Sequence, residues 1–243
     1  MSARNVVIVT GGSSGIGDEI CRRMIAAGYE TISLALKRPG WSDPRLHAFE
    51  VDLTDEKATG GIAAEIASRF AVTHVVHNAG AIRPALLPEV KNDDLHALTQ
   101  LHLGSALLLV QAILPGMRAN RFGRIVLISS RGALGLQTRS AYAATKAGMI
   151  GMGRTWALEL APDGITVNMV APGPIGGTEM FHAVVPAGSE RERALAQQIP
   201  VRRVGTPADV ANAVMFFAAR ESSFVTGQVL YVCGGASVGT LVV

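Results

Sequence analysis

Cysteine, long apolar runs and concentrated charge are all scarce in this chain of 243 residues. Its two cysteines, Cys21 and Cys233, form no CxxC or metal-ligand pattern, so we expect reduced thiols and no metal site. No stretch of about 18 uninterrupted apolar residues could span a membrane. The longest candidate, Leu101 to Leu114, contains polar residues and indicates a core or subunit-interface helix. Because the first strand signal begins within about five residues, there is no room for a signal peptide, and we expect a cytoplasmic protein without a membrane partner.

Charge is equally modest. Charged residues make up 17% of the chain, the net charge is +3, and the lysines and arginines are scattered rather than gathered into a stripe. This distribution is weak evidence for a nucleic-acid partner, and we predict none. Hydrophobic residues make up 49%, which is enough for a large core in one domain spanning residues 1–243.

Strand and helix signals alternate along the chain, which predicts an α/β fold. We expect a doubly wound, parallel, Rossmann-type sheet in a three-layer α/β/α arrangement, built from right-handed βαβ units. A segment rich in Pro, Gly and charge, at about 174–204, interrupts the pattern; we interpret it as a substrate lid, with a surface loop as the alternative. Strands are expected at 5–10, 31–36, 46–52, 73–77, 123–129, 164–170 and 228–233, and helices at 16–27, 55–69, 92–119, 140–161 and 207–219.

A glycine-rich segment, Thr10-Gly-Gly-Ser-Ser-Gly-Ile-Gly17, follows the β-branched run Val6 to Val9. Such a run predicts a buried strand, and the glycines allow a tight turn and a close approach of backbone to a ligand. The helix expected at about Ile16 would point its free N–H groups and positive dipole end at a phosphate. A strand, this turn and a helix opening the chain are typical of a dinucleotide-binding fold, whereas a ligand-free turn is the alternative.

Two residues one helical turn apart, Tyr142 and Lys146, are candidates for acid–base chemistry. A neighbouring ammonium group favours the phenolate, so we expect Lys146 to lower the pKa of Tyr142 from its reference of about 10. The buried strand from Arg124 ends in two hydroxyls, Ser129 and Ser130, at the edge where ligands bind in such sheets. These serines could instead satisfy turn backbone.

Together these motifs resemble the short-chain dehydrogenase/reductase family, in its single-domain form of about 250 residues, over nearly the whole chain. The glycine turn, Asp52, Asn78-Ala-Gly80, Tyr142 with Lys146, Val167-Asn168 and Pro172-Gly173, followed by Ile175 and Thr178, match family motifs in order. The resemblance implies that Tyr142 is the general acid or base, that Lys146 lowers its pKa and holds the cofactor ribose, and that a serine binds the substrate oxygen. The cofactor would carry the hydride.

The predicted cofactor contacts come from the whole length of the chain. They are Gly11, Ser13, Ser14, Gly15, Ile16, Gly17, Lys37, Arg38, Asp52, Leu53, Asn78, Ala79, Gly80, Tyr142, Lys146, Pro172, Gly173, Ile175 and Thr178.

The end of the second strand bears on the choice of cofactor. NAD-binding folds place an acid there for the ribose 2′-hydroxyl, but this chain has Ala35 at that position, followed by Lys37 and Arg38. Two cations suit a 2′-phosphate, so we predict NADP, with NAD possible.

The chain departs from the family pattern at two places. Alignment of the strand from Arg124 puts Ser130 in the catalytic position, whereas counting back from Tyr142 gives Ser129. Because a strand register is fixed and a loop can lose a residue cheaply, we predict Ser130. His102 stands where the family usually has an Asn that supports a proton relay; histidine could continue the relay, or it could be a satisfied core residue.

These observations predict an oxidoreductase that interconverts a small carbonyl and a secondary alcohol. A 3-oxoacyl thioester reductase, with Arg202 and Arg203 meeting a phosphate, is one alternative, and a cofactor-binding sensor without turnover is another. The apolar residues around 101–114 and 147–160 exceed what one sheet covers, and the tail Val238 to Val243 is also apolar. We therefore expect a homo-oligomer, as a tetramer.

Overall fold

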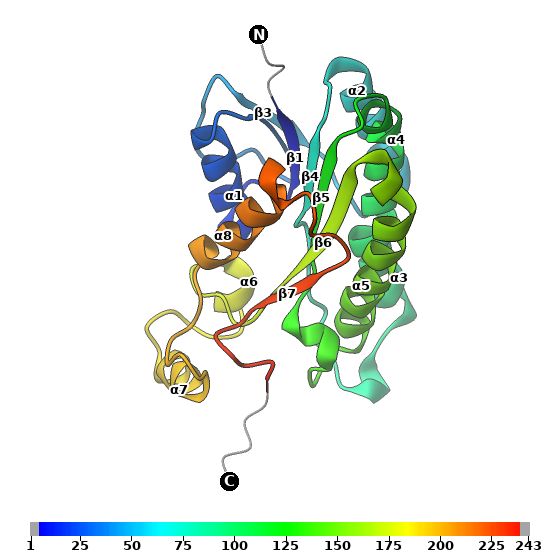
Figure 1. Cartoon of the computed structure of the whole chain (residues 1–243). Helices are drawn as coiled ribbons and strands as arrows, with labels where there is room; N and C mark the ends of the chain where they lie inside the picture. Colours follow the sequence, from blue (N-terminus) through cyan, green and yellow to red (C-terminus); the bar gives the residue numbers. More distant parts are fainter. Residues whose placement is uncertain (1–4, 239–243) are drawn as a thin grey trace.

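A single parallel sheet organises residues 5–238, the part of the chain that this computed structural model describes (Figure 1). Its seven strands lie in the order β3-β2-β1-β4-β5-β6-β7. The chain therefore moves outward from β1 through β2 to β3, then returns to the other side of β1 with β4. Their bounds are β1 Val6–Thr10, β2 Glu30–Ala35, β3 Leu46–Glu50, β4 His74–His77, β5 Gly123–Ile128, β6 Ile165–Pro172 and β7 Val229–Val232.

Helices cover both faces of the sheet, which gives the predicted three layers. One face is covered by α1 (Gly15–Ala26) and α8 (Pro207–Ala218), and the other by α2 (Glu56–Arg69), α4 (Ser105–Ala119) and α5 (Ser140–Leu160). The remaining longer segments are α3 (Asn92–Thr99), a π-helical turn η2 (Gln100–Gly104), α6 (Glu179–His182) and α7 (Glu190–Gln198). Short 3₁₀ turns complete the list at η1 (Leu87–Glu89), η3 (Arg131–Leu134), η4 (Ala161–Asp163) and η5 (Arg220–Ser222).

The buried β-branched residues of β1 explain why both layers are needed. Side chains alternate along a strand, so Val7 and Val9 pack with α1 and α8 while Val6 and Ile8 pack with α2 and α4. Two hydrophobic cores therefore share one sheet, and neither face of β1 meets water.

The predicted fold class and the predicted elements are confirmed, with most ends correct to within two residues. Two details differ. The expected helix 92–119 contains the π turn η2, and the interruption at 174–204 holds the short helices α6 and α7. By length and composition Asn92–Ala119 could cross a membrane, alone among the helices of the described residues. Its inner side chains, including Leu109 and Ile113, pack in the core.

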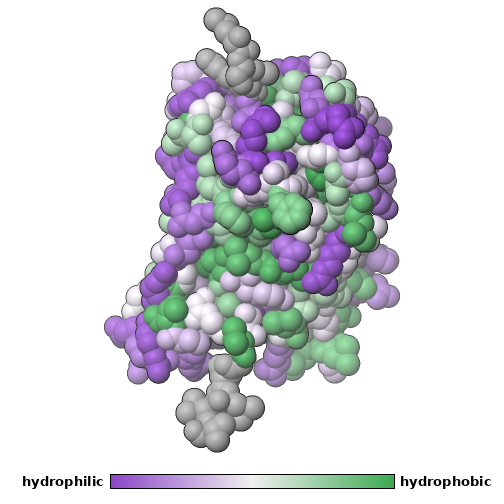
Figure 2. All heavy atoms as spheres, viewed as in Figure 1, coloured by the Kyte–Doolittle hydropathy of each residue, from purple (hydrophilic) through white to green (hydrophobic). Residues whose placement is uncertain are grey.

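Some apolar side chains reach the surface. Figure 2 shows them gathered in the middle of one face, over α8 and β7, where Phe216 and Leu230 are exposed. Leu107 on α4 and Leu158 on α5 are exposed on the opposite helix layer. Most of the residues around 101–114 that we expected at an interface are instead buried, because they pack in the core of their own chain.

The point where the strand order reverses, between β1 and β4, decides where a ligand can bind. The loops after these two strands leave in opposite directions and open a crevice at the carboxyl edge of the sheet. Thr10 ends β1 and His77 ends β4, so the glycine-rich turn and Asn78 meet at this crevice.

Candidate active site

A cavity of about 410 Å³ lies at the carboxyl edge of the sheet. It is bounded by the glycine turn after β1, the ends of β4, β5 and β6, the start of α5 and the segment around α6. Its lining comprises Gly11, Ser14, Gly15, Ile16, Asn78, Ala79, Gly80, Ile82, Ile128, Ser129, Ser130, Leu136, Arg139, Tyr142, Lys146, Pro172, Gly173, Pro174, Ile175, Thr178, Glu179, Met180, Phe181, Val184 and Val185. The structure thus brings together the serines, Tyr142, Lys146 and most of the predicted cofactor contacts.

The glycine turn has two positions with a backbone conformation that residues with a side chain rarely adopt. Gly11 and Gly15 have φ values of +66° and +56°, in the left-handed region that favours glycine. A Cβ atom at Gly17 would overlap the Gly11 carbonyl oxygen, so the turn and the first turn of α1 are packed backbone to backbone. Ser14, the N-cap of α1, makes no side-chain cap, which leaves the N–H groups of the helix start facing the cavity side without a side-chain acceptor.

Asn78 joins the glycine turn to the end of β4. Its side-chain amide donates to the Thr10 carbonyl oxygen at 3.1 Å, and its backbone N–H donates to the Thr10 hydroxyl oxygen at 2.9 Å. The backbone N–H of Ala79 donates to the same hydroxyl. Asn78 therefore holds the glycine turn against the end of β4 and also lines the cavity.

Ser130 and Tyr142 both line the cavity and lie against the same residue, Gly132. Ser130 caps the turn η3, and its hydroxyl oxygen accepts a hydrogen bond from the Gly132 N–H at 2.9 Å. The nearby Ser130 hydroxyl acts to lower the pKa of the phenol. Burial is the larger influence and raises the pKa of Tyr142 above its ordinary value of 10.0.

Ser129, by contrast, is tied into the scaffold. Its hydroxyl donates to the backbone carbonyl of Lys146 at 2.8 Å, while the Lys146 ammonium donates to the backbone carbonyl of Ile128 at 2.7 Å. These two reciprocal bonds, which we call the β5–α5 clasp, join the end of β5 to the second turn of α5. They support Ser130, the next residue, as the serine that acts beside Tyr142.

The pKa of Tyr142 is raised, whereas the sequence predicted that Lys146 would lower it. The Lys146 ammonium nitrogen lies 5.8 Å from the centre of the Tyr142 ring, but the charge that lowers the pKa of the phenol belongs to Arg139. Burial lowers the pKa of Lys146 itself from 10.5 to about 7, so the amine is only partly charged near neutral pH. Burial therefore outweighs the charges around the Tyr142 phenol, and a pKa-lowering role for Lys146 stays a prediction.

His102 lies in the π turn η2 and is fully buried beneath the site. Its Nδ1 is 2.8 Å from the Thr145 hydroxyl, and its Nε2 accepts from the Ala81 N–H at 3.3 Å. Burial and then the charge of Lys146 hold the pKa of His102 far below its usual range, so the ring stays neutral. Its ring packs edge-on against Tyr142, with 5.7 Å between ring centres. A π turn inside a helix often marks a functional site.

Several predicted cofactor residues lie outside the cavity lining. Lys37 and Arg38 follow β2 on the surface and pair with Glu179 at 3.3 Å and Glu50 at 3.2 Å. Asp52 is exposed and accepts from Thr54, whereas Leu53 is buried against Ala79. Ser13 and Gly17 belong to the glycine turn but do not line the cavity. The roles of these six residues stay predictions.

The segment after β6 forms the other wall. Thr178 caps α6 by accepting from the Phe181 N–H at 3.2 Å, and its methyl carbon would lie 3.2 Å from a Cβ at Gly15. Asn168, earlier in β6, bonds to the backbone around Val225 and Gln228 and has a structural role. The α6 segment therefore closely approaches the glycine turn.

Sequence reasoning missed Arg139 as a cavity residue, together with the apolar side chains of Ile82 and Leu136. Arg139 stands three residues before Tyr142, and that spacing was the available signal.

Comparisons with known proteins agree with this geometry. Residues 11–237 match the family model described as Enoyl-(Acyl carrier protein) reductase. A (2S)-[(R)-hydroxy(phenyl)methyl]succinyl-CoA dehydrogenase subunit, BbsC from Thauera aromatica, is 38% identical, covering 96% of this chain and 94% of its own. The 3-oxoacyl-[acyl-carrier-protein] reductase MabA from Mycobacterium tuberculosis is 36% identical, covering 96% and 93%.

A solved structure agrees equally well. A putative NAD(P)-dependent gluconate 5-dehydrogenase from Beutenbergia cavernae, crystallised with NADP, superposes with a TM-score of 0.90 at 32% identity and 98% coverage of both chains. The match extends along the whole sheet and across the site, so the likeness is not confined to one motif. The chain belongs to the short-chain dehydrogenase/reductase family of NAD(P)-dependent oxidoreductases that act on alcohols and carbonyls.

Proposed function

We propose that this enzyme interconverts a small carbonyl compound and its secondary alcohol with NADP, using Tyr142 as the acid and base. The observation that carries the proposal is the convergence of Tyr142, Ser130 and Lys146 on one cavity that also opens onto the glycine turn. We propose NADP as the cofactor because the Beutenbergia relative was crystallised with it and because Lys37 and Arg38 follow β2. NAD remains the second cofactor to test.

The residues present fit a dinucleotide. Left-handed glycines, backbone packing that excludes a Cβ, and a helix start without a side-chain cap together make a cradle for a pyrophosphate. Gly11, Ser14, Gly15 and Ile16 would hold the phosphates, Ala79 and Gly80 would lie along the adenosine side, and Lys146 would hold the ribose. When bound, the cofactor supplies or accepts a hydride.

The protein's own groups would handle the proton. Tyr142 gives its phenolic proton to the carbonyl oxygen in reduction and takes it back in oxidation. Burial keeps the phenol protonated near neutral pH, which suits an acid. Ser130, aimed by the Gly132 N–H, donates a hydrogen bond to the oxygen where negative charge develops. Neutral His102 would keep Thr145 and the Ala81 backbone in place beneath Lys146.

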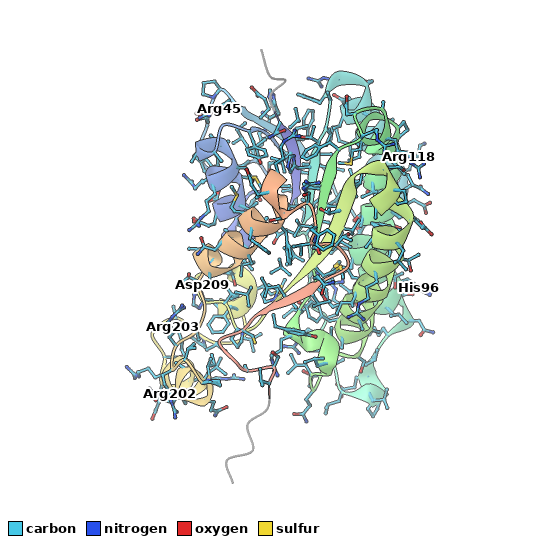
Figure 3. The ribbon with its side chains drawn as sticks, in the orientation of Figure 1. Arg45, His96, Arg118, Arg202, Arg203 and Asp209 are labelled. Atoms are coloured by element: carbon cyan, nitrogen blue, oxygen red, sulfur yellow. The ribbon has the colours of Figure 1, made fainter. Side chains whose placement is uncertain are left out.

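A 3-oxoacyl thioester is the second candidate substrate, favoured by the name of MabA. Arg202 and Arg203 were expected to meet a phosphate of such a substrate. Arg203 instead makes two bonds to the Asp209 carboxylate, at 2.7 and 2.9 Å, and Figure 3 shows the two residues together near the start of α8. Arg202 donates to the backbone carbonyl of Gln197. Both guanidinium groups are thus engaged, and the thioester candidate rests on the relatives alone.

We also propose that the enzyme works in the cytoplasm as a homotetramer. Exposed apolar residues on two separate faces, Leu107 and Leu158 on one and Phe216 and Leu230 on the other, support two kinds of contact between copies. The free, buried Cys21 and Cys233 suit a reducing compartment. Of the predicted apolar tail, residues 239–243 lie outside the described residues.

The substitution Tyr142→Phe tests the proposed function. It removes only the hydroxyl, so kcat for a carbonyl panel with NADPH is expected to fall roughly 100- to 10,000-fold, with NADPH affinity retained. Tyr231→Phe in β7, outside this cavity, is the matched control and keeps wild-type turnover. Cofactor binding by the wild type without consumption across a broad panel would instead favour the sensor hypothesis.

A further inference from the structure

One cation in the cavity lining exchanges no proton in the proposed reaction, although its charge lowers the pKa of the Tyr142 phenol. Lys146 is buried and bonded to the Ile128 carbonyl, whereas Arg139 is partly buried at the start of α5, directly before the turn that carries Tyr142. These are the two cationic side chains that line the cavity within residues 5–238. Arg139 therefore places a permanent positive charge beside the position where a substrate would react.

The backbone around Arg139 is held in place. Arg139 forms a parallel β-bridge with Ala85, and the Ala85 N–H donates to the Thr138 carbonyl at 3.0 Å. Thr138 itself has a φ of +65°, a left-handed conformation that a β-branched residue adopts only under constraint. Two segments distant in sequence thus fix the direction from which Arg139 enters the cavity.

The guanidinium group keeps one edge available. Its Nη1 donates to the carbonyl and the hydroxyl of Thr138, while Nε and Nη2 have no hydrogen-bond partner among the described residues. No described carboxylate forms an ion pair with it. The acid in the lining, Glu179, pairs with Lys37 instead. The Nε–Nη2 edge is a planar fork that matches the two oxygens of a carboxylate.

The rest of this wall is apolar. Ile82, Leu136, Met180, Phe181, Val184 and Val185 line the cavity and offer no acceptor side chain. We propose that Arg139 binds a carboxylate of the substrate, so that the enzyme acts on oxo acids and hydroxy acids whose remaining carbon atoms contact these apolar side chains. This inference rests on the proposed function and names its substrate class.

The carboxylate stays ionised and unreacted throughout. In reduction, the carbonyl carbon gains a hydride from the reduced nicotinamide cofactor, and its oxygen gains the proton of the Tyr142 hydroxyl. The carbonyl becomes an alcohol, the cofactor leaves oxidised, and solvent returns the proton to Tyr142. Arg139 orients the substrate and is a specificity residue, without exchanging a proton.

The test compares an oxo acid with its neutral ester. For 3-benzoylpropionate and its methyl ester, kcat/KM with NADPH should favour the acid in the wild type. Arg139→Gln should lower the acid-to-ester ratio roughly 10- to 100-fold, as expected for loss of a charged hydrogen-bonded pair. Arg139→Lys should restore part of the ratio. Arg131→Gln is the matched control, because Arg131 bonds to the Ala236 carbonyl and does not line the cavity.

A binding measurement separates this inference from the proposed function. Titration of 4-phenylbutyrate, which has the carboxylate but no ketone, into the NADP-loaded protein should show affinity that Arg139→Gln weakens about tenfold or more. Arg139-dependent binding without any turnover would overturn the proposed function and keep the carboxylate contact of Arg139. Two results would overturn the inference and keep the proposed function. One is that the wild type reduces the ester at least as fast as the acid. The other is that Arg139→Gln loses as much affinity for NADPH as it loses for the carboxylate.

Discussion

Lys146 combines full burial with an amine that is charged in the unfolded chain, and this makes stability depend on pH. Its pKa is about 7 in the folded protein against an ordinary 10.5, because burial disfavours the cation. Between these values the unfolded state binds more protons, so stability rises with pH from about 7 towards 10, by at most roughly 1.4 kcal/mol per pH unit. Below pH 7 the charged amine is buried in full and the protein is least stable.

We therefore expect Lys146→Met to raise the Tm of the cofactor-free protein at pH 6 and to lose that advantage by pH 10. Thermal unfolding of both proteins across this range measures the difference. A constant offset between the two Tm curves would contradict a titrating Lys146.

The pair between Lys37 and Glu179 bears on cofactor choice at the same scale. The double substitution Lys37→Ala, Arg38→Ala should weaken NADPH binding roughly tenfold or more and change NADH binding little, because charged hydrogen bonds to the 2′-phosphate are lost. Glu179→Gln should strengthen NADPH binding by a few-fold at most, since an exposed pair contributes about 1 kcal/mol or less. Fluorescence titration measures both, with Glu190→Gln on α7 as the control. Equal losses for NADPH and NADH in the double variant would argue against a 2′-phosphate contact.

Residue-level prediction from the sequence succeeded where a motif has a fixed spacing. Tyr142 and Lys146 lie one helical turn apart on α5, as expected. The strand register favoured Ser130 over Ser129, whose hydroxyl bonds to the scaffold, and the choice of Ser130 stays a prediction. Prediction from the sequence did not foresee that Lys146 is buried and that burial lowers the pKa of its amine, because burial cannot be read from spacing. It also missed Arg139, whose direction depends on a bridge to Ala85, 54 residues earlier in the chain.

At the scale of elements, the start of α8 depends on a local cluster. Thr206 and Asp209 form a capping box, and Arg203 adds a two-bond contact to the same carboxylate. Thr206→Ala should cost about 1 kcal/mol, which for a chain of this size lowers Tm by roughly 2–4 °C.

The same cluster holds the pKa of Asp209 well below 3.8, chiefly through the Arg203 bonds. The contribution of Asp209 is therefore present above about pH 4 and is lost as pH falls towards the lowered pKa. Differential scanning calorimetry of Asp209→Asn should show a lower Tm than wild type at pH 7 and a smaller gap at pH 3. The same Tm difference at pH 7 and pH 3 would show that the charge of Asp209 does not contribute to the helix cap.

Element types were predictable because hydrophobic periodicity and glycine placement act locally. The helix 92–119 was recognised, but its π turn was not, since an extra residue in one turn follows from how His102 and Leu101 pack rather than from composition. The helices α6 and α7 have no fully buried side chains, so their sequences carry no apolar stripe from which a helix could be predicted.

For the whole molecule, the two exposed apolar faces predict a tetramer with two kinds of interface. Light scattering after gel filtration should give four copies at micromolar concentration. Leu158→Glu on α5 and Phe216→Glu on α8 should each reduce the tetramer to a dimer, because a charge would be buried in one interface while the other remains. Leu87→Glu in η1 is the control, as Leu87 is exposed but belongs to neither face. A monomeric wild type would contradict the prediction.

The β5–α5 clasp has a consequence for how this enzyme could change its chemistry over time. Because Ser129 and Lys146 each bond to the main chain of the other's element, the spacing between Tyr142 and Ser130 is set by β5, α5 and the turn η3 that Ser130 caps. The stretch around α6 contributes nothing to that spacing. New substrates could therefore be acquired by replacing that stretch wholesale, and a chimera carrying a relative's version should inherit the relative's preferences together with this chain's reaction.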